Sequence, residues 1–246
     1  MRESTQKHIR IHAERMYPQE SCGVIIVQKG KDTYIPCANV GGRDDNFAIS
    51  PANYAMAADM GTIIAIVHSH PDTVARPSEA DKVSCEATNL PWHIVHVSVP
   101  DGAKDLVPVA TEIYTFEPAG FEAPLVGRSF VHGVLDCYTL VRDKYKRDYG
   151  IILPDFERED DWWYAGQNLY LDNFAKAGFE QVEGPPQVGD GILMQIRSPV
   201  ANHAAVYLGR GIILQHLAGR MSSRDVYDGY FQECTRMIVR HKDMKT

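Results

Sequence analysis

The first half of the chain alternates amphipathic segments with short apolar runs. Residues 5–16 place Ile9, Ala13 and Met16 on one helical face, at spacings of four and three. The run over 62–68 is almost continuously apolar, which is typical of a buried strand. The predicted helices are 5–16, 51–60 and 78–88, and the predicted strands are 23–28, 34–40, 62–68, 93–99 and 112–116. This pattern predicts a domain that mixes helices with a sheet.

The second half begins with helices and continues with strands. A helix is expected to begin near Asp136, and a longer helical stretch covers 159–176, with Trp162, Leu169 and Phe174 as core candidates. The predicted strands are 191–196, 203–208 and 212–217, and a Gly-rich turn joins the last two into a hairpin.

A segment rich in Pro and Gly separates the two halves. It lacks a clean hydrophobic period, as a linker does. We therefore expect two domains, residues 1–116 and 132–246, joined by a linker over 117–131.

Composition narrows the class of protein. With 44% hydrophobic and 23% charged residues, the chain has globular rather than disordered or fibrous composition. Its net charge of −7 disfavours nucleic-acid binding through a basic face, so no nucleic-acid partner is expected. No apolar run approaches the ~20 residues of a membrane span, and residues 1–20 lack the apolar core of a signal peptide. The 5 cysteines are scattered without a C-x-x-C, which indicates reduced thiols rather than disulfides.

A candidate metal site follows the strand predicted over 62–68. His68 and His70 are two residues apart, so in an extended segment both imidazoles face one side. If Ser78 begins a helix, Ser78 and Asp81 lie on one face, a turn apart. Two His and one Asp supply three ligands and leave a fourth position for water, as catalytic zinc sites do. Zinc would lower the pKa of that water to roughly 7, and Glu20 is the candidate base that takes its proton.

Other interpretations of these residues stay open at this point. The two histidines could be surface residues, and Ser78-x-x-Asp81 is also the pattern of an N-terminal capping box. A site of two His and one carboxylate could also hold Fe(II) instead of zinc.

Taken together, the motifs resemble the signature of the JAMM/MPN metalloproteases. His-Ser-His-Pro is followed by six residues and Ser-x-x-Asp, and Pro-Gln-Glu-Ser-Cys-Gly lies upstream. The resemblance implies an α/β/α sandwich that hydrolyses peptide or isopeptide bonds. It also implies zinc on His68, His70 and Asp81, Glu20 as general base, and Ser78 as the group that stabilises the oxyanion.

A candidate nucleophile begins the helix of the second half. Asp136 is a good N-cap, which places Cys137 at the first helical position, where the helix dipole favours a thiolate. If Gly209-Arg210 forms a two-residue hairpin turn, His203 lies directly opposite His216. One histidine could then act as base while the other orients its ring. The alternative for Cys137 is a buried, unreactive thiol.

These residues resemble the NlpC/P60 family of papain-like cysteine peptidases. The matching motifs are Asp-Cys-x-x-Leu-Val at 136, Gly-Asp at 189 and Asn-His-x-x-Val-Tyr-Leu-Gly at 202. The resemblance implies a papain-like domain with an antiparallel sheet, Cys137 as nucleophile, His203 as base and His216 as the ring-orienting residue. It also implies an endopeptidase that cuts the stem peptides of bacterial peptidoglycan. Tyr-Thr follows the cysteine where the family usually has Ser-Gly, which puts the breadth of substrates in doubt.

The fusion of the two domains resembles tail assembly proteins of long-tailed phages. That resemblance implies a place at the virion tail tip, assembly in the host cytoplasm and other tail-tip proteins as partners. The alternative function is a structural or chaperone component of the tail tip with one or both centres inactive.

Overall fold

The computed structural model describes residues 1–41, 47–102 and 106–244. The chain divides into two compact units, Met1–Glu122 and Ala123–Thr246. Their boundary falls inside the linker predicted over 117–131. None of the helices in the described ranges is long and apolar enough to cross a membrane.

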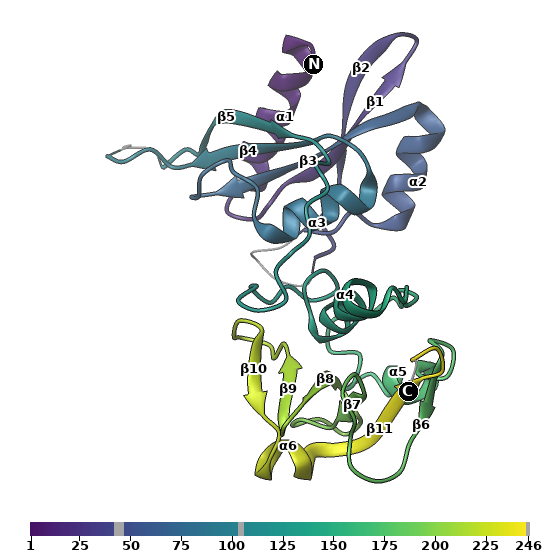
Figure 1. Cartoon of the computed structure of the whole chain (residues 1–246). Helices are drawn as coiled ribbons and strands as arrows, with labels where there is room; N and C mark the ends of the chain where they lie inside the picture. The colour runs from purple at the N-terminus through teal and green to yellow at the C-terminus, as the bar shows by residue number, and fades with distance from the viewer. Residues whose placement is uncertain (42–46, 103–105, 245–246) are drawn as a thin grey trace. The chain divides into compact units, whose positions relative to one another are not determined.

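The first unit is built on a mixed five-stranded sheet (Figure 1). Its elements are α1 (Glu3–Met16), β1 (Cys22–Gln28), β2 (Lys31–Cys37), α2 (Pro51–Met60), β3 (Thr62–Pro71), α3 (Glu79–Thr88), β4 (Trp92–Ser98) and β5 (Val109–Phe116). The strand order is β2-β1-β3-β4-β5, and β3 runs parallel to β4 while the other neighbours are antiparallel.

Helices cover both faces of this sheet. On one face, Ile9 and Ala13 of α1 pack against a cluster that includes Val67 of β3. On the other face, Ala57 of α2 and Cys85 of α3 belong to a second buried cluster. The unit is therefore a three-layer α/β/α sandwich, as predicted.

The second unit contains a six-stranded antiparallel sheet. Its elements are α4 (Cys137–Tyr149), α5 (Leu169–Asn173), β6 (Phe179–Gln181), β7 (Gly191–Met194), β8 (His203–Gly209), β9 (Ile212–Gln215), β10 (Ser223–Val226), α6 (Gly229–Cys234) and β11 (Thr235–His241). The strand order is β10-β9-β8-β7-β11-β6 (Figure 1). On one face, Val141 and Tyr145 of α4 pack in a cluster with Ala204 and Val206 of β8.

The start of the second unit is fixed by a buried arginine. Arg128 is fully buried, and its Nη1 lies 2.6 Å from Asp143 Oδ2 of α4. Its backbone N–H donates to Ser222 Oγ at 3.1 Å. Residues 123–131, which lie within the predicted linker, are therefore part of this unit.

The helix predicted over 159–176 is wrong. Only α5, five residues long, is helical there, and residues 160–166 form turns. Asp161 and Gly166 have φ of 54° and 82°, in the left-handed region that a right-handed helix cannot include. The apolar period instead reflects packing of the turns, since Trp162 is only 1% exposed.

Candidate active sites

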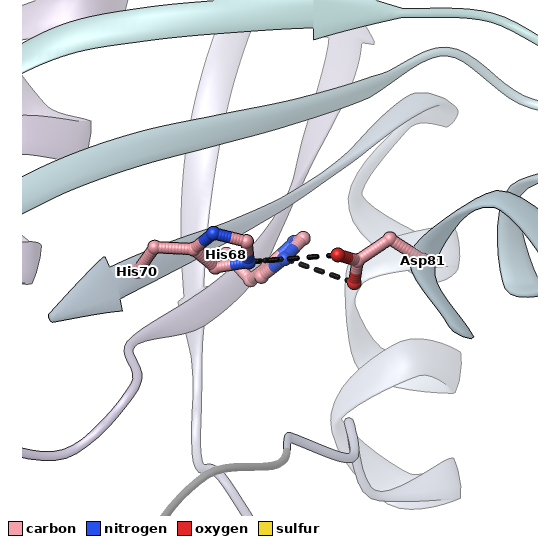
Figure 2. A group of neighbouring side chains, drawn as sticks. All are labelled: His68, His70 and Asp81. Carbon is pink, nitrogen blue, oxygen red and sulfur yellow. Dashed lines mark hydrogen bonds and ion pairs between the residues drawn. The ribbon is translucent and has the colours of Figure 1, made fainter. Parts of the chain in front are cut away.

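Two elements of the first unit bring together one aspartate and two histidines (Figure 2). His68 Nε2 lies 3.1 Å from His70 Nε2 and 3.2 Å from Asp81 Oδ1. His70 Nε2 lies 3.5 Å from Asp81 Oδ2. One ligand atom from each residue thus lies within 4.8 Å of the others.

Local backbone structure explains this convergence. Strand β3 continues to Pro71, so both histidines are in extended backbone and share one side of it. Ser78 is the N-cap of α3, and Asp81 is in the first turn. Ser78 Oγ accepts from the Asp81 backbone N–H at 3.1 Å and donates to Asp81 Oδ2 at 2.7 Å. The capping box is therefore real, and it also fixes the carboxylate that faces the histidines.

The ring nitrogens are arranged for a metal ligand set. His70 Nδ1 lies 3.1 Å from the carbonyl of Val74, which accepts its proton and leaves Nε2 as the basic nitrogen. Phe47 stacks on His68 with ring centroids 4.4 Å apart and helps to hold that ring. His68 Nδ1 is buried and has no hydrogen-bond partner among the described residues.

Electrostatics keep two of the three donors, His68 and Asp81, in the form that binds a cation. Burial lowers the pKa of His68 despite the neighbouring carboxylate, so its imidazole is neutral at pH 7. Burial alone would raise the pKa of Asp81, but its contacts with His68, His70 and Ser78 hold it well below its usual value. Two imidazoles and one carboxylate at these distances fit a divalent metal that accepts N and O ligands.

Glu20 lies at the edge of the same site. It is 9% exposed and immediately precedes Ser21 and strand β1, in which Cys22 pairs with His68 of β3. Burial alone would lower the pKa of His70, but Asp81, the Val74 carbonyl and Glu20 raise it. The carboxylate of Glu20 is therefore close enough to act on His70.

Cys137 is the first residue of α4, as predicted from its N-cap. Asp136 accepts hydrogen bonds from the backbone N–H groups of Thr139 at 2.9 Å and Gly133 at 3.0 Å. The Arg158 guanidinium also lies 3.0 Å from Asp136. Burial alone would raise the pKa of Asp136, but Arg158 and the backbone donors hold it below its usual value.

The Cys137 thiol contacts a tyrosine in this structure. Its Sγ lies 3.1 Å from the Tyr170 hydroxyl, and the described contacts include no hydrogen bond between Cys137 and His203. Burial and the charge of Asp136 raise the pKa of the thiol to about 11, so it is neutral at pH 7. A hydrogen bond with the backbone of Ala204 acts in the opposite direction and places the sulfur beside the residue that follows His203.

The predicted register of the hairpin is wrong. Ala205 pairs with Gln215, so His203 is not directly opposite His216. The turn is Arg210-Gly211, with φ of 53° and 72°, and an irregularity between Tyr207 and Gly209 moves the pairing once more. Two-residue hairpin turns need positive φ at both positions and favour Gly at the second, which selects Arg210-Gly211. The net slip of one residue places His216 on the other face.

Gln215 takes the position expected of His216. His203 Nε2 lies 3.0 Å from Gln215 Oε1, and because an amide oxygen only accepts, Nε2 carries the proton. His203 is buried, which lowers its pKa to about 4. His216 is also buried, and its ring packs edge-on against Phe130 with centroids 5.1 Å apart. The Arg210-Gly211 turn alone would place His216 opposite Ala205, and only the irregularity between Tyr207 and Gly209 brings Gln215 there, so no sequence signal identified Gln215.

An apolar cavity adjoins the thiol site. It has a volume of about 50 Å³, and its lining includes Tyr138, Trp162, Tyr170 and Ala204. Tyr170 thus both borders the cavity and contacts Cys137, so the cavity and the Cys137 thiol share one wall.

The chain matches the models of two protein families. Residues 2–109 match the prokaryotic homologs of the JAB domain, and residues 127–240 match the NlpC/P60 family. The two-domain fold and the fusion predicted from the motifs are thereby confirmed.

Relatives that combine both domains match along the chain. The tail tip assembly protein K of Escherichia phage N15 is 42% identical over 248 residues, covering 100% of this chain and 97% of the relative. The chain belongs to the tail tip assembly protein K family. A second member, from Escherichia phage lambda, is 41% identical over 195 residues, covering 79% of this chain and 89% of the relative.

Solved structures with a measurable likeness to this K-family member are more distant. An NlpC/P60 family protein from Bacillus cereus is 11% identical, with a TM-score of 0.36, and the match covers 89% of this chain and 79% of that chain. Protein DSY2949 from Desulfitobacterium hafniense is 23% identical, with a TM-score of 0.34, and the match covers 49% of this chain and 91% of that chain.

Proposed function

We propose that this protein acts in tail-tip assembly and carries two hydrolytic centres. The second unit would be an endopeptidase for peptidoglycan stem peptides, and the first a zinc-dependent hydrolase of peptide or isopeptide bonds. The names of the two relatives support a location at the tail tip and other tail-tip proteins as partners. Assembly in the host cytoplasm is part of the proposal. The observation that best supports the proposed peptidase activity is the orientation of the His203 imidazole, whose Nε2 is hydrogen-bonded to Gln215.

The thiol centre would work by general-base and nucleophilic catalysis. With the proton on Nε2, the Nδ1 atom of His203 is the base that takes the proton of Cys137. The sulfur then attacks the substrate carbonyl, and backbone N–H groups at the start of α4, other than that of Thr139, stabilise the oxyanion. His203 returns the proton to the leaving amine, and water releases the acyl group. The neutral thiol and imidazole of the resting state fit proton transfer during attack rather than a preformed ion pair.

The metal centre would use the donor set of the first unit. His68, His70 and Asp81 would hold a zinc ion, which supplies Lewis acidity and an acidified water when bound. Glu20 would take and return the proton, and its influence on the pKa of His70 supports this role. Ser78 holds Asp81 in this geometry, so its part in stabilising an oxyanion would require its hydroxyl to leave that carboxylate.

Digestion of purified muropeptides by the full chain tests the thiol centre. We expect the wild type to release shorter stem peptides, detected by mass spectrometry, and Cys137→Ala to release none. Cys234→Ala is the matched control, because that cysteine is buried in the same unit, in a cluster away from α4. A wild type that leaves muropeptides intact, or a Cys137→Ala variant of equal activity, would contradict the proposal.

One observation favours a second function, that of a structural or chaperone component with inactive centres. The Cys137 thiol is held by Tyr170 and its pKa is about 11, which is unlike an activated nucleophile. Complementation distinguishes the two functions. Phage that carry Cys137→Ala and His68→Ala and still form normal infectious tails would support the structural function.

A further inference from the structure

A line of three hydrogen-bonded side chains crosses the end of the second sheet. Strands β8, β9 and β10 are neighbours (Figure 1), and they contribute His203, Gln215 and Asp225 in that order. His203 Nε2 lies 3.0 Å from Gln215 Oε1, and Gln215 Nε2 donates to Asp225 Oδ2 at 2.7 Å. Gln215 is 1% exposed, so solvent does not replace either bond.

The carboxylate at the end of this line is itself anchored. Arg220 Nη2 donates to Asp225 Oδ1 at 3.0 Å, and Ser223 Oγ donates to Oδ2 at 2.7 Å. Burial alone would raise the pKa of Asp225, but the donors Gln215, Ser223 and Arg220 hold it below its usual value. Asp225 is therefore ionised at pH 7, and an ionised carboxylate can only accept hydrogen bonds.

Because Asp225 can only accept, the orientation of the Gln215 amide and the tautomer of His203 are both determined. The amide of Gln215 must turn its NH₂ to Asp225, which leaves its oxygen for His203. The imidazole must then protonate Nε2 and keep Nδ1 basic, since the two ring nitrogens of a neutral histidine have opposite roles.

We propose that Asp225 is a positioning residue that selects the catalytic tautomer of His203 through the amide of Gln215. This inference rests on the proposed thiol peptidase activity. Asp225 does not touch the reacting atoms and acts only through the orientation of the amide.

The substitution Asp225→Asn keeps the size of the side chain but reverses the direction of the hydrogen bonds along the three side chains. Arg220 lies beside Oδ1, so the oxygen of the new amide stays there and its NH₂ faces Gln215. Gln215 must then turn its oxygen to position 225 and its NH₂ to His203. The imidazole is left with Nδ1 protonated, which removes the base. We expect kcat on muropeptides to fall by about 10²- to 10⁴-fold, the range of general-base catalysis, with KM unchanged.

A second substitution restores the original direction of the hydrogen bonds. It therefore distinguishes an effect on the tautomer of His203 from an effect on the stability of the strands. In Gln215→Glu/Asp225→Asn, the new carboxylate accepts from both His203 and the amide at position 225. We expect the Nε2 tautomer and most of kcat to return. A loss that came only from a weakened β9–β10 pair would not be rescued by this change.

The tautomer can be measured without substrate. The ¹⁵N shifts of the imidazole nitrogens, assigned by comparison with His203→Gln, report whether Nε2 or Nδ1 carries the proton. We expect protonated Nε2 in the wild type and in the double variant, and protonated Nδ1 in Asp225→Asn. Asp228→Asn is the matched control, because that residue is exposed and its side chain makes no capping hydrogen bond. We expect it to keep the wild-type tautomer and activity.

The outcomes distinguish this inference from the proposed activity. A wild type without muropeptide cleavage but with the predicted tautomer switch would contradict the peptidase function and support the role of Asp225. Retention of protonated Nε2 in Asp225→Asn would overturn the inference, whatever the activity of the wild type.

Discussion

Zinc binding should stabilise the first unit, and loss of one ligand should abolish the effect. The ligand atoms are already close together in the folded unit, whereas in the unfolded chain His68 and Asp81 are thirteen positions apart. A ligand that binds only the folded state stabilises it by about 2.7 kcal/mol at a free concentration of 100 times its Kd. The first unit comprises residues 1–122, so its entropy of unfolding predicts an increase in Tm of about 10 °C.

Differential scanning calorimetry of the full chain, with a chelator and then with excess Zn²⁺, measures this shift. We expect the increase for the wild type and none for His70→Ala, each compared with its own melt in chelator. His96→Ala is the matched control. His96 pairs with His70 across β3 and β4, but its ring binds the carbonyl of Thr73 and the hydroxyl of Ser98. That variant should melt lower and still respond to zinc.

Two results would refute this reasoning. One is a wild type whose melting is unaffected by zinc at any concentration that leaves the protein soluble. The other is an equal shift in the wild type and in His70→Ala, because the stabilisation would then come from zinc bound elsewhere. Metal analysis after dialysis gives an independent check, with about one zinc per chain expected for the wild type.

Three further predictions concern reactivity and stability. Burial raises the pKa of Cys137 to about 11, so the rate of its alkylation by iodoacetamide should still increase roughly tenfold per pH unit between pH 8 and pH 10. Mass spectrometry measures this rate. A rate that reaches a plateau near pH 7 would contradict the prediction. Asp136→Asn removes one of the two carboxylate partners of Arg158, which keeps its contact with Asp155 at 3.1 Å, and should lower the free energy of unfolding by about 1–3 kcal/mol at pH 7. Because the pKa of Asp136 is lowered in the folded state, its contribution to stability is present above the unfolded pKa of about 3.9 and is lost on acidification. The free energies of unfolding of the wild type and the variant, measured by urea titration, should therefore converge toward pH 2. Gly23→Ala should cost about 1–3 kcal/mol in the first unit, because the added Cβ would meet the carbonyl oxygen of Ile35 at 2.5 Å; an unchanged urea midpoint would be inconsistent with that contact.

The metal site was predictable because its residues follow local backbone periods. His68 and His70 share a side of one strand, and Ser78 and Asp81 share the first turn of one helix. The spacings of two and three residues therefore predict that the two members of each pair lie on the same side of their strand or helix. Whether the residues of β3 lie close to those of α3 depends on the tertiary fold. That contact was predicted only from the resemblance of the motifs to a known family.

The thiol site was less predictable because it depends on pairing between strands. A turn shifted by one residue and an irregularity near Leu208 decide whether residue 215 or 216 shares a face with His203. Neither feature alters the hydrophobic pattern enough to be recognised. The contact of Tyr170 with Cys137 was missed for a related reason, since the turns over 160–166 imitate a helical period.

The strand order has a consequence for synthesis on the ribosome. The sheet of the first unit is complete once β5 has emerged, so that unit can fold while translation continues. In the second unit, β11 is made last among the strands and yet lies inside the sheet, between β7 and β6. The nascent second unit must therefore remain open until nearly all of its residues have been translated, and a ribosome that stalls before β11 would leave it unfolded beside an already folded neighbour.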